Sequence, residues 1–352
     1  MKIVQLGQSD LMVNTICLGT MTFGEQNNQE QAHQQLDAAF DLGLHFIDTA
    51  EMYPVMARET TYGDTERFIG NWFEKNPGKR DHMVLASKVA GPARGMNWIR
   101  EGSYPNKATI EQACNDSLAR LKTDHIDLYQ IHWPSRNVPV FGALYYDPSK
   151  DRPTPGFDEV LGAMESLVKA GKIRYVGVSN ETPWGIMEYS KIAKQAGLPM
   201  IASMQNAYNL LNRQIENGLD EVCLRENVGI LAYSPLAFGR LTGKYDTGGY
   251  TKEGKPVGRL THFPPTWSPR YVRPETLIAT RRYGEVAKAF GLTLTQLSLA
   301  FCQHKSFISS TIIGCTSVEQ LHECVQASQV KLTPEIMAAV DAVRWDIRDP
   351  AQ

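Results

Sequence analysis

Residues 83–88 read Met-Val-Leu-Ala-Ser-Lys, a short apolar run that ends in a lysine. Two similar runs flank it along the chain: residues 45–48 end in Asp48, and residues 126–132 end in His132. Short apolar runs bounded by polar and turn-forming residues are typical of buried β-strands. Because helical patterns separate the runs, we expect three consecutive parallel strands whose carboxyl ends lie at the same side of one sheet.

The alternation of strand and helix patterns continues along the whole chain. Further strands are predicted at residues 16–19, 173–178, 200–205, 229–233 and 311–314. Helices are predicted at residues 29–42, 65–74, 109–121, 157–170, 183–195, 218–225, 277–290, 294–304, 318–325 and 333–343. This pattern predicts a (β/α)8 TIM barrel, an α/β fold, as a single domain over residues 1–352. An open doubly wound sheet is the competing fold, but its usual G-x-G-x-x-G motif after the first strand is not found.

Composition and charge restrict the classes of function. The chain is 42% hydrophobic with a net charge of −2, which gives no basic field for nucleic acid and no attraction to anionic membranes. No apolar run reaches the roughly 18 residues that span a bilayer, and the N-terminus lacks a signal-peptide pattern, so a cytoplasmic location is expected. The six cysteines form no C-x-x-C pair and are expected to be reduced and buried. The eight histidines show no metal-ligand spacing, so no metal site is expected.

Four polar residues follow the predicted strand ends: Asp48, Tyr53, Lys88 and His132. Each alone is readily explained by packing, capping or solvation, but in a barrel their joint placement puts them where active sites lie. A tyrosine has a pKa of about 10 and is a weak acid. We expect Lys88 to lower that pKa, and Asp48 to keep Lys88 charged. With His132 bonding the same substrate oxygen, the cluster suits a reaction in which a carbonyl oxygen gains negative charge and a proton.

Three long segments, residues 54–64, 133–154 and 246–273, are predicted to be loops. Long loops at the active end of a barrel commonly shape a substrate pocket or a lid. Residues 249–255, Gly-Tyr-Thr-Lys-Glu-Gly-Lys, begin like a phosphate-binding loop. However, Pro256 replaces the required Ser or Thr and no strand leads into the motif, so an ATPase is not expected.

The chain resembles the aldo-keto reductase superfamily, and within it the bacterial Tas-like subgroup most of all. The resemblance lies in residues 18–24, 48–54, 130–134, 171–182, 232–245 and 314–317, which follow the family's order along nearly the whole chain. It implies a (β/α)8 barrel that binds NADPH in an extended form and reduces aldehydes and ketones to alcohols. It also implies that Tyr53 is the proton donor, that Lys88 and Asp48 tune it, and that His132 orients the substrate.

The resemblance further implies which residues contact the cofactor and the substrate, a small carbonyl compound. Ser179, Asn180 and Gln205 would hold the nicotinamide carboxamide, and Tyr233 would stack on the nicotinamide ring. Thr20, Met21 and Gln26 would line the site from the first loop, and Asp48 would also contact the cofactor. The phosphates would be wrapped by Ser234, Pro235, Leu236, Gly239 and Lys244, and the segment after the last strand would add Gly314, Thr316, Gln320 and Glu323. Met52 and Trp133 would be walls of the substrate pocket.

That last segment departs from the family pattern. Gln320 stands where many relatives have an arginine for the 2′-phosphate, and Cys324 where many have an asparagine for adenine. The potassium-channel β-subunits also have glutamine at the first position and are associated with NADP, and Arg259 is a candidate for the missing cation. A second hypothesis is therefore an NADP(H)-loaded redox sensor or binding protein similar to those subunits, with slow turnover. A third is a reductase specialised for a vitamin or sugar aldehyde.

Overall fold

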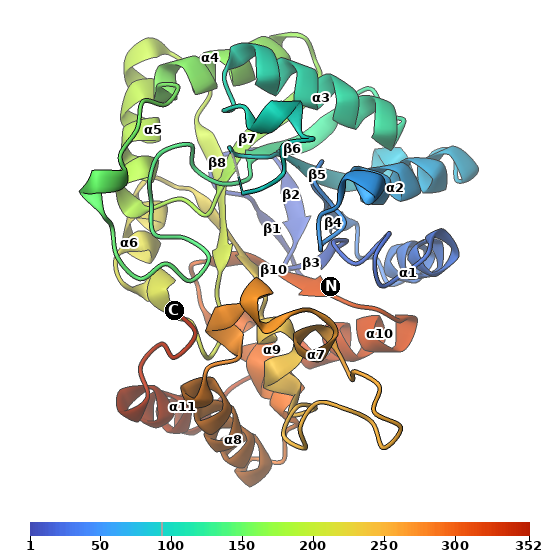
Figure 1. The fold of residues 1–352 in the computed structure, drawn as a ribbon, viewed down its shortest axis with the longest axis vertical. Helices are drawn as coiled ribbons and strands as arrows, with labels where there is room; N and C mark the ends of the chain where they lie inside the picture. The colour runs from blue at the N-terminus through green and yellow to red at the C-terminus, as the bar shows by residue number, and fades with distance from the viewer. Residues whose placement is uncertain (93) are drawn as a thin grey trace.

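The computed structural model describes residues 1–92 and 94–352, without the side chain of Trp267. Within these residues, eight parallel strands close into a barrel in the order β10-β3-β4-β5-β6-β7-β8-β9, with helices around it (Figure 1). The strands are β3 (Ile16–Gly19), β4 (Phe46–Asp48), β5 (Val84–Val89), β6 (Ile126–Ile131), β7 (Ile173–Ser179), β8 (Ile201–Ala207), β9 (Gly229–Tyr233) and β10 (Ile308–Gly314). The predicted (β/α)8 barrel is confirmed.

The helices follow the predicted segments closely. They are α1 (Gln29–Asp41), α2 (Asp64–Lys75), α3 (Lys107–Leu121), α4 (Phe157–Lys169), α5 (Pro183–Ala196), α6 (Leu219–Arg225), α8 (Pro274–Ala289), α9 (Leu294–His304), α10 (Val318–Ala327) and α11 (Pro334–Asp346). Helix α8 begins at Pro274 rather than at residue 277, because proline fits the first helical turn, where no backbone donor is needed.

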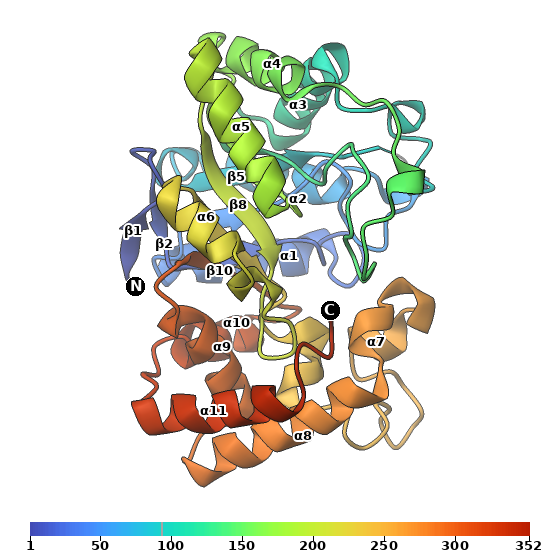
Figure 2. The ribbon, with the colours of Figure 1, turned by 90° about the vertical axis from the view of Figure 1, so that its left-hand side faces the viewer.

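A hairpin at the N-terminus is an element that periodicity did not predict. Strands β1 (Ile3–Gln5) and β2 (Met12–Asn14) pair antiparallel, and they lie on the side of the barrel opposite the short helix α7 (Arg259–His262) (Figure 2). Each strand has only three residues, too few to show an alternating pattern. The hairpin buries Leu6, Leu11 and Val13 in a core cluster inside the barrel.

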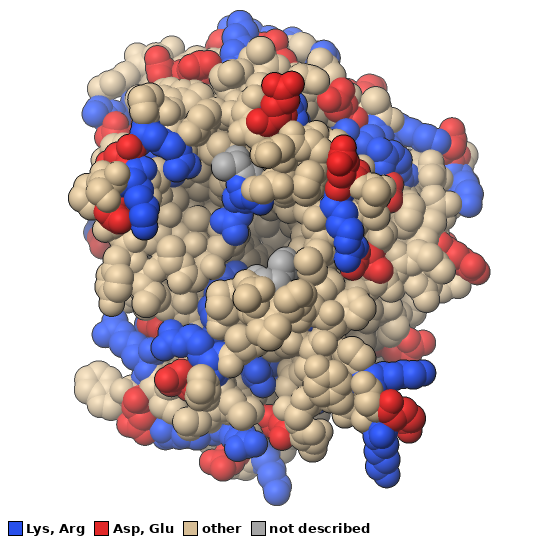
Figure 3. Space-filling view, viewed as in Figure 1, with Lys and Arg blue, Asp and Glu red and all other residues tan. Residues whose placement is uncertain are grey.

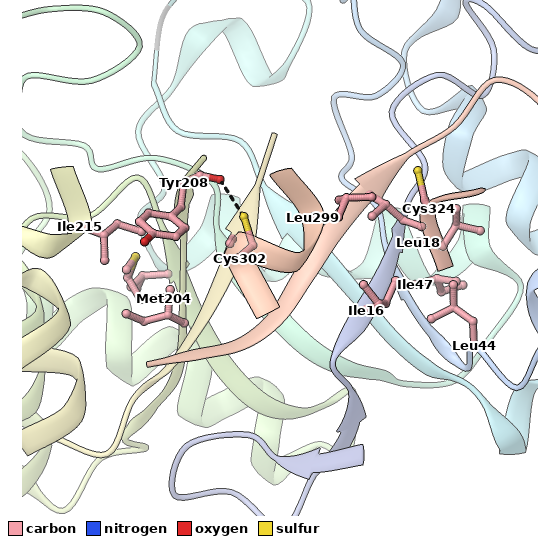
Figure 4. Close-up of a cluster of buried hydrophobic side chains, with 14 of the residues drawn as sticks. Ile16, Leu18, Leu44, Ile47, Met204, Tyr208, Ile215, Leu299, Cys302 and Cys324 are labelled. Atoms are coloured by element: carbon pink, nitrogen blue, oxygen red, sulfur yellow. Dashed lines mark hydrogen bonds between the residues drawn. The ribbon is translucent and has the colours of Figure 1, made fainter. Parts of the chain in front are cut away.

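The main core lies between the barrel and its helices. Figure 4 shows Leu18 of β3 beside Leu299 of α9 and Cys324 of α10, and all three are buried in one cluster. All six cysteines are free and buried, as predicted. In the described part of the chain, the search for a helix long and apolar enough to cross a membrane found none.

Candidate active site

A cavity of about 1050 Å³ opens among the loops that follow the barrel strands. The face in Figure 3 is hollowed at its centre, and Lys and Arg atoms lie along the edge of the hollow. Asp48 is the last residue of β4, Lys88 lies in β5, and His132 directly follows β6. Tyr53 lies in the loop after β4. Because parallel neighbouring strands end together, the fold brings these four residues to one place at the base of the cavity.

The Lys88 ammonium is the centre of the cluster. It is fully buried, and its Nζ donates to Asp48 Oδ2 at 2.5 Å and to the Thr49 carbonyl at 2.8 Å. The Tyr53 hydroxyl lies 3.4 Å from the same Nζ. Burial by itself lowers the pKa of Lys88, but Asp48 and Tyr53 outweigh it and raise that pKa above its ordinary value. Lys88 is therefore charged at neutral pH.

Two amides hold the other oxygen of Asp48. Gln205 Nε2 donates to Oδ1 at 2.8 Å, and Gln130 Nε2 donates to the same oxygen at 3.2 Å. Gln130 was given no role from the sequence because it lies inside a strand, whereas the residues singled out lie at or just past the strand ends. With both oxygens bonded, the Asp48 carboxylate is fixed in position, as a buried charge must be if the fold is to be stable.

The pKa of Tyr53 departs from the sequence-based expectation. Burial raises the pKa above its ordinary value, and the opposing effect of Lys88 does not cancel that rise. The prediction that Lys88 gives Tyr53 a lowered pKa is therefore wrong in its net direction. The consequence is that the phenol keeps its proton at neutral pH, while the ammonium beside it is ready to stabilise a phenolate.

His132 lies against Tyr53, with ring centroids 5.7 Å apart and the planes at 78°. Burial, followed by the charges of Lys88 and Arg94, lowers the pKa of His132 well below its ordinary value. The imidazole is therefore neutral at neutral pH. Its Nδ1 is buried and has no hydrogen-bond partner among the described residues. A neutral imidazole can hydrogen-bond a substrate oxygen, but it holds no spare proton to give away.

Polar side chains form a shelf beside the cluster, at the ends of β7, β8 and β9. Asn180 has a positive φ of 56°, and its Nδ2 donates to the His132 carbonyl at 2.8 Å and to Ser179 Oγ at 3.0 Å. The Tyr233 hydroxyl donates to Asn180 Oδ1 at 2.7 Å, and Ser179 Oγ donates to the Gln205 carbonyl. These bonds fix the shelf relative to His132.

The far part of the cavity carries cations. Lys244 lies between two glycines: an added Cβ would approach its Cε to 2.7 Å at Gly239 and its Nζ to 2.5 Å at Gly258. The Arg259 guanidinium lies 5.1 Å from the Phe238 ring centroid and contacts Met21 Sδ at 3.9 Å. Burial lowers the pKa of Arg259 to about 10, so the side chain remains charged at neutral pH.

The remaining predicted residues lie on the wall of this same cavity. They are Thr20, Met21, Gln26, Met52, Trp133, Ser179, Asn180, Gln205, Tyr233, Ser234, Pro235, Leu236, Gly239, Lys244, Arg259, Gly314, Thr316, Gln320 and Glu323. Gln320 is turned back onto its own loop, where its Oε1 accepts from the Thr316 amide at 2.9 Å.

Comparisons with known proteins agree with this geometry. The family model described as "Aldo/keto reductase family" matches residues 15–344. The Escherichia coli protein tas is 43% identical over the full length of both chains. A Babesia bovis aldo-keto reductase is 38% identical over 76% of this chain and 98% of its own. The chain belongs to the aldo/keto reductase family. It is therefore an oxidoreductase of a family that reduces carbonyl groups.

A more distant relative is similar over most of its length. The Bacillus subtilis protein YrpG, described as an uncharacterized oxidoreductase, is 29% identical over 97% of this chain and 96% of its own. The similarity thus extends through the barrel and its loops alike.

This aldo/keto reductase also has cavity residues that sequence reasoning missed. Arg94, Trp98, Phe141 and Arg270 line the wall, and all four lie outside the barrel strands. Loop residues follow no hydrophobic period, so no sequence pattern showed that they face the cavity. The only signal was the length of the two loops that carry Phe141 and Arg270.

Proposed function

We propose that the chain reduces aldehydes and ketones to alcohols with NADPH, and that Tyr53 donates the proton. The observation that carries this proposal is the protonated Tyr53 phenol at the cavity wall, 3.4 Å from the charged Lys88 ammonium. When the proton leaves, Lys88 stabilises the phenolate electrostatically. When bound, NADPH supplies the hydride that adds to the carbonyl carbon.

The neutral state of His132 supports the same division of roles. Because its pKa is well below the ordinary value, it positions the carbonyl oxygen by hydrogen bonding and leaves the proton transfer to Tyr53. The His132 carbonyl accepts a hydrogen bond from Asn180 Nδ2 at 2.8 Å. This bond fixes the position of His132 relative to the polar residues at the ends of β7, β8 and β9. A fixed donor geometry is what lowers the barrier when charge develops on the substrate oxygen.

The polar groups of the cavity suit NADPH. Gln26 Oε1 and Arg259 Nε are buried without a hydrogen-bond partner among the described residues, which is the state expected of groups that await a polar ligand. Ser179, Asn180 and Gln205 would hold the carboxamide, and Tyr233 would stack on the ring. Lys244 and Arg259 would bind phosphates, and Arg259 supports a preference for NADPH over NADH.

The test is NADPH oxidation by the purified protein with a panel of aldehydes, ketones and quinones. We expect Tyr53→Phe to lower kcat by about 10²- to 10⁴-fold, the usual contribution of a positioned acid, while the Kd for NADPH stays within about threefold. Tyr62→Phe is the matched control, since Tyr62 donates to Glu51 at 3.1 Å and does not line the cavity.

Two results would overturn the proposal. If Tyr53→Phe kept more than a tenth of the activity, Tyr53 would not be the proton donor. If no carbonyl were reduced although NADPH bound tightly, the redox-sensor hypothesis would replace the enzyme.

A further inference from the structure

Two arginines line the cavity beside Phe141 and Gly142 of the long loop 133–154. Arg94 lies in the loop after β5, and Arg270 lies in the short helix η8 (Pro269–Tyr271). The Arg94 guanidinium stacks over the Phe141 ring at 4.2 Å from its centroid. At the next residue, an added Cβ on Gly142 would lie 3.9 Å from Arg270 Cβ. Phe141 and Gly142, which are neighbours in the long loop, thus each lie beside one of the two arginines.

Both arginines line the same cavity as Tyr53 and His132. The charge of Arg94 contributes to the lowered pKa of His132. The Arg270 guanidinium interacts with the Tyr233 hydroxyl, which in turn donates to Asn180. An anionic group held by these two arginines would therefore belong to a molecule that also reaches Tyr53 and His132.

Among the described residues, neither arginine has a counter-ion. In residues 1–92 and 94–352, the acidic residues on the cavity wall are Asp48 and Glu323, and Asp48 is already bound by Lys88. Glu323 lies on α10, in the segment after the last strand. Burial, together with the charge of Arg270, lowers the pKa of Arg94 despite the opposing effect of Tyr233. An anion between the two guanidinium groups would relieve their repulsion and accept charge-assisted hydrogen bonds from both.

The wall between the arginines and Tyr53 is apolar. Met52, Trp98 and Phe141 pack around buried Trp133, and all four line the cavity. Such a surface favours the flat or aliphatic body of a small molecule, while the arginines favour its charged end.

We propose that the preferred substrates are carbonyl compounds with a carboxylate on a short apolar or aromatic frame, the carboxylate being bound by Arg94 and Arg270. This inference rests on the proposed function and names its substrate class. In the reaction, hydride from NADPH forms the new C–H bond, the C=O π bond breaks, and the oxygen takes the Tyr53 proton. The products are a hydroxy acid and NADP⁺.

The test compares para-carboxybenzaldehyde with para-carbamoylbenzaldehyde, which are similar in size but differ in charge. We expect the wild type to favour the carboxylate by at least about tenfold in kcat/KM, the value of one charged hydrogen bond. Arg94→Gln and Arg270→Gln should each lower kcat/KM for the carboxylate by roughly 10- to 100-fold, mainly through a higher KM. For the amide, each should lower kcat/KM by less than about threefold. Arg225→Gln, an exposed cation outside the cavity, is the matched control.

The outcomes separate this inference from the proposed function. If the wild type reduces both aldehydes equally well and needs Tyr53, the reductase stands and the carboxylate site is wrong. The carboxylate site is also wrong if the arginine variants lower kcat/KM for both aldehydes by the same factor.

If neither these two aldehydes nor any other carbonyl of the panel is reduced, the proposed function fails, and calorimetry of benzoate against benzamide on the protein with NADP⁺ still tests the arginines. Benzoate binding that the two variants abolish supports the site, whereas no benzoate binding overturns it.

Discussion

Charges at the base of the cavity are paired within the protein, whereas charges on the part of its wall that we call the rim are not paired with any described residue. At the base, Lys88 and Asp48 form a buried ion pair, and Gln205 and Gln130 bond the remaining carboxylate oxygen. At the rim, Lys244, Arg94, Arg259 and Arg270 carry positive charge, and no carboxylate lies within ion-pair distance of them in the part of the chain described. The protein thus balances the charges at the base by itself, whereas no described residue balances the charges at the rim.

Two buried ion pairs elsewhere in the fold contrast with the arginines of the rim. Arg100 donates to both oxygens of buried Glu51, at 2.7 and 2.6 Å. Arg136 pairs in the same two-pronged way with buried Glu181. These two arginines have protein carboxylates as partners. Arg94, Arg259 and Arg270 all line the cavity and have no carboxylate partner among the described residues, which supports ligands as their partners.

Removing the charge at the base should have the largest effect. Lys88→Met leaves the buried Asp48 carboxylate without its partner, so we expect a loss of about 3–5 kcal/mol in the free energy of unfolding. We also expect kcat to fall by about 10²-fold or more, because no cation then stabilises the Tyr53 phenolate. Chemical denaturation and steady-state kinetics measure the two effects.

The double variant Asp48→Asn/Lys88→Met serves as the control for this prediction. Since it removes both charges, most of the stability should return while the activity does not. A single variant as stable as the wild type would show that the ion pair does not support the fold.

Removing a charge from the rim should have the opposite effect on stability. Arg259→Gln takes away a desolvated cation that has no counter-ion, so the free energy of unfolding should stay the same or rise. The affinity for NADPH should fall by about 10- to 100-fold, as expected for a lost charged hydrogen bond. Fluorescence titration with NADPH and with NADH measures the change.

The comparison of the two cofactors locates the contact. If Arg259 binds the 2′-phosphate, only NADPH is affected, whereas equal losses would place it at the pyrophosphate. If Arg259→Gln lowered the stability but left the binding of both cofactors unchanged, Arg259 would not be a phosphate-binding residue.

The base could be predicted from the sequence far better than the rim. Asp48, Lys88 and His132 lie at strand ends, and strand ends are set by a hydrophobic pattern that can be read directly. Gln130 was not assigned a role because it lies inside a strand, where the hydrophobic pattern does not distinguish a functional position. The direction of the Tyr53 pKa shift was wrong because burial depends on the loops that cover the phenol.

Of the rim cations, Lys244 was assigned in advance through its place in the family's pattern, and Arg259 as a loop cation that could replace the arginine missing at Gln320. Arg94 and Arg270 lie in segments without periodicity, and their approach depends on how residues 133–154 turn at Phe141 and Gly142. The N-terminal hairpin was missed for a related reason, since strands of three residues are too short to show a period.

The smallest expected effect is a pH dependence of the stability that comes from His132, whose pKa depends on charges at both the base and the rim. Because its folded pKa lies well below the ordinary value of about 6.5, the unfolded chain binds a proton below that pH that the folded chain does not. The stability should therefore fall as the pH falls below about 6.5, with a contribution of at most about 1.4 kcal/mol per pH unit. The difference between the wild type and His132→Gln in denaturation curves from pH 7 to pH 5 isolates this contribution from that of other histidines.

The variant Arg94→Gln tests whether the base or the rim lowers the pKa of His132. Lys88 acts on His132 from the base and Arg94 from the rim, in addition to burial. Arg94→Gln should therefore raise the pKa of His132, so that the stability loss still begins at about pH 6.5 but ends at a higher pH and is smaller in total, without affecting the Lys88–Asp48 pair. If the curve of Arg94→Gln coincides with that of the wild type, burial and Lys88 suffice, and the two regions of the cavity act independently.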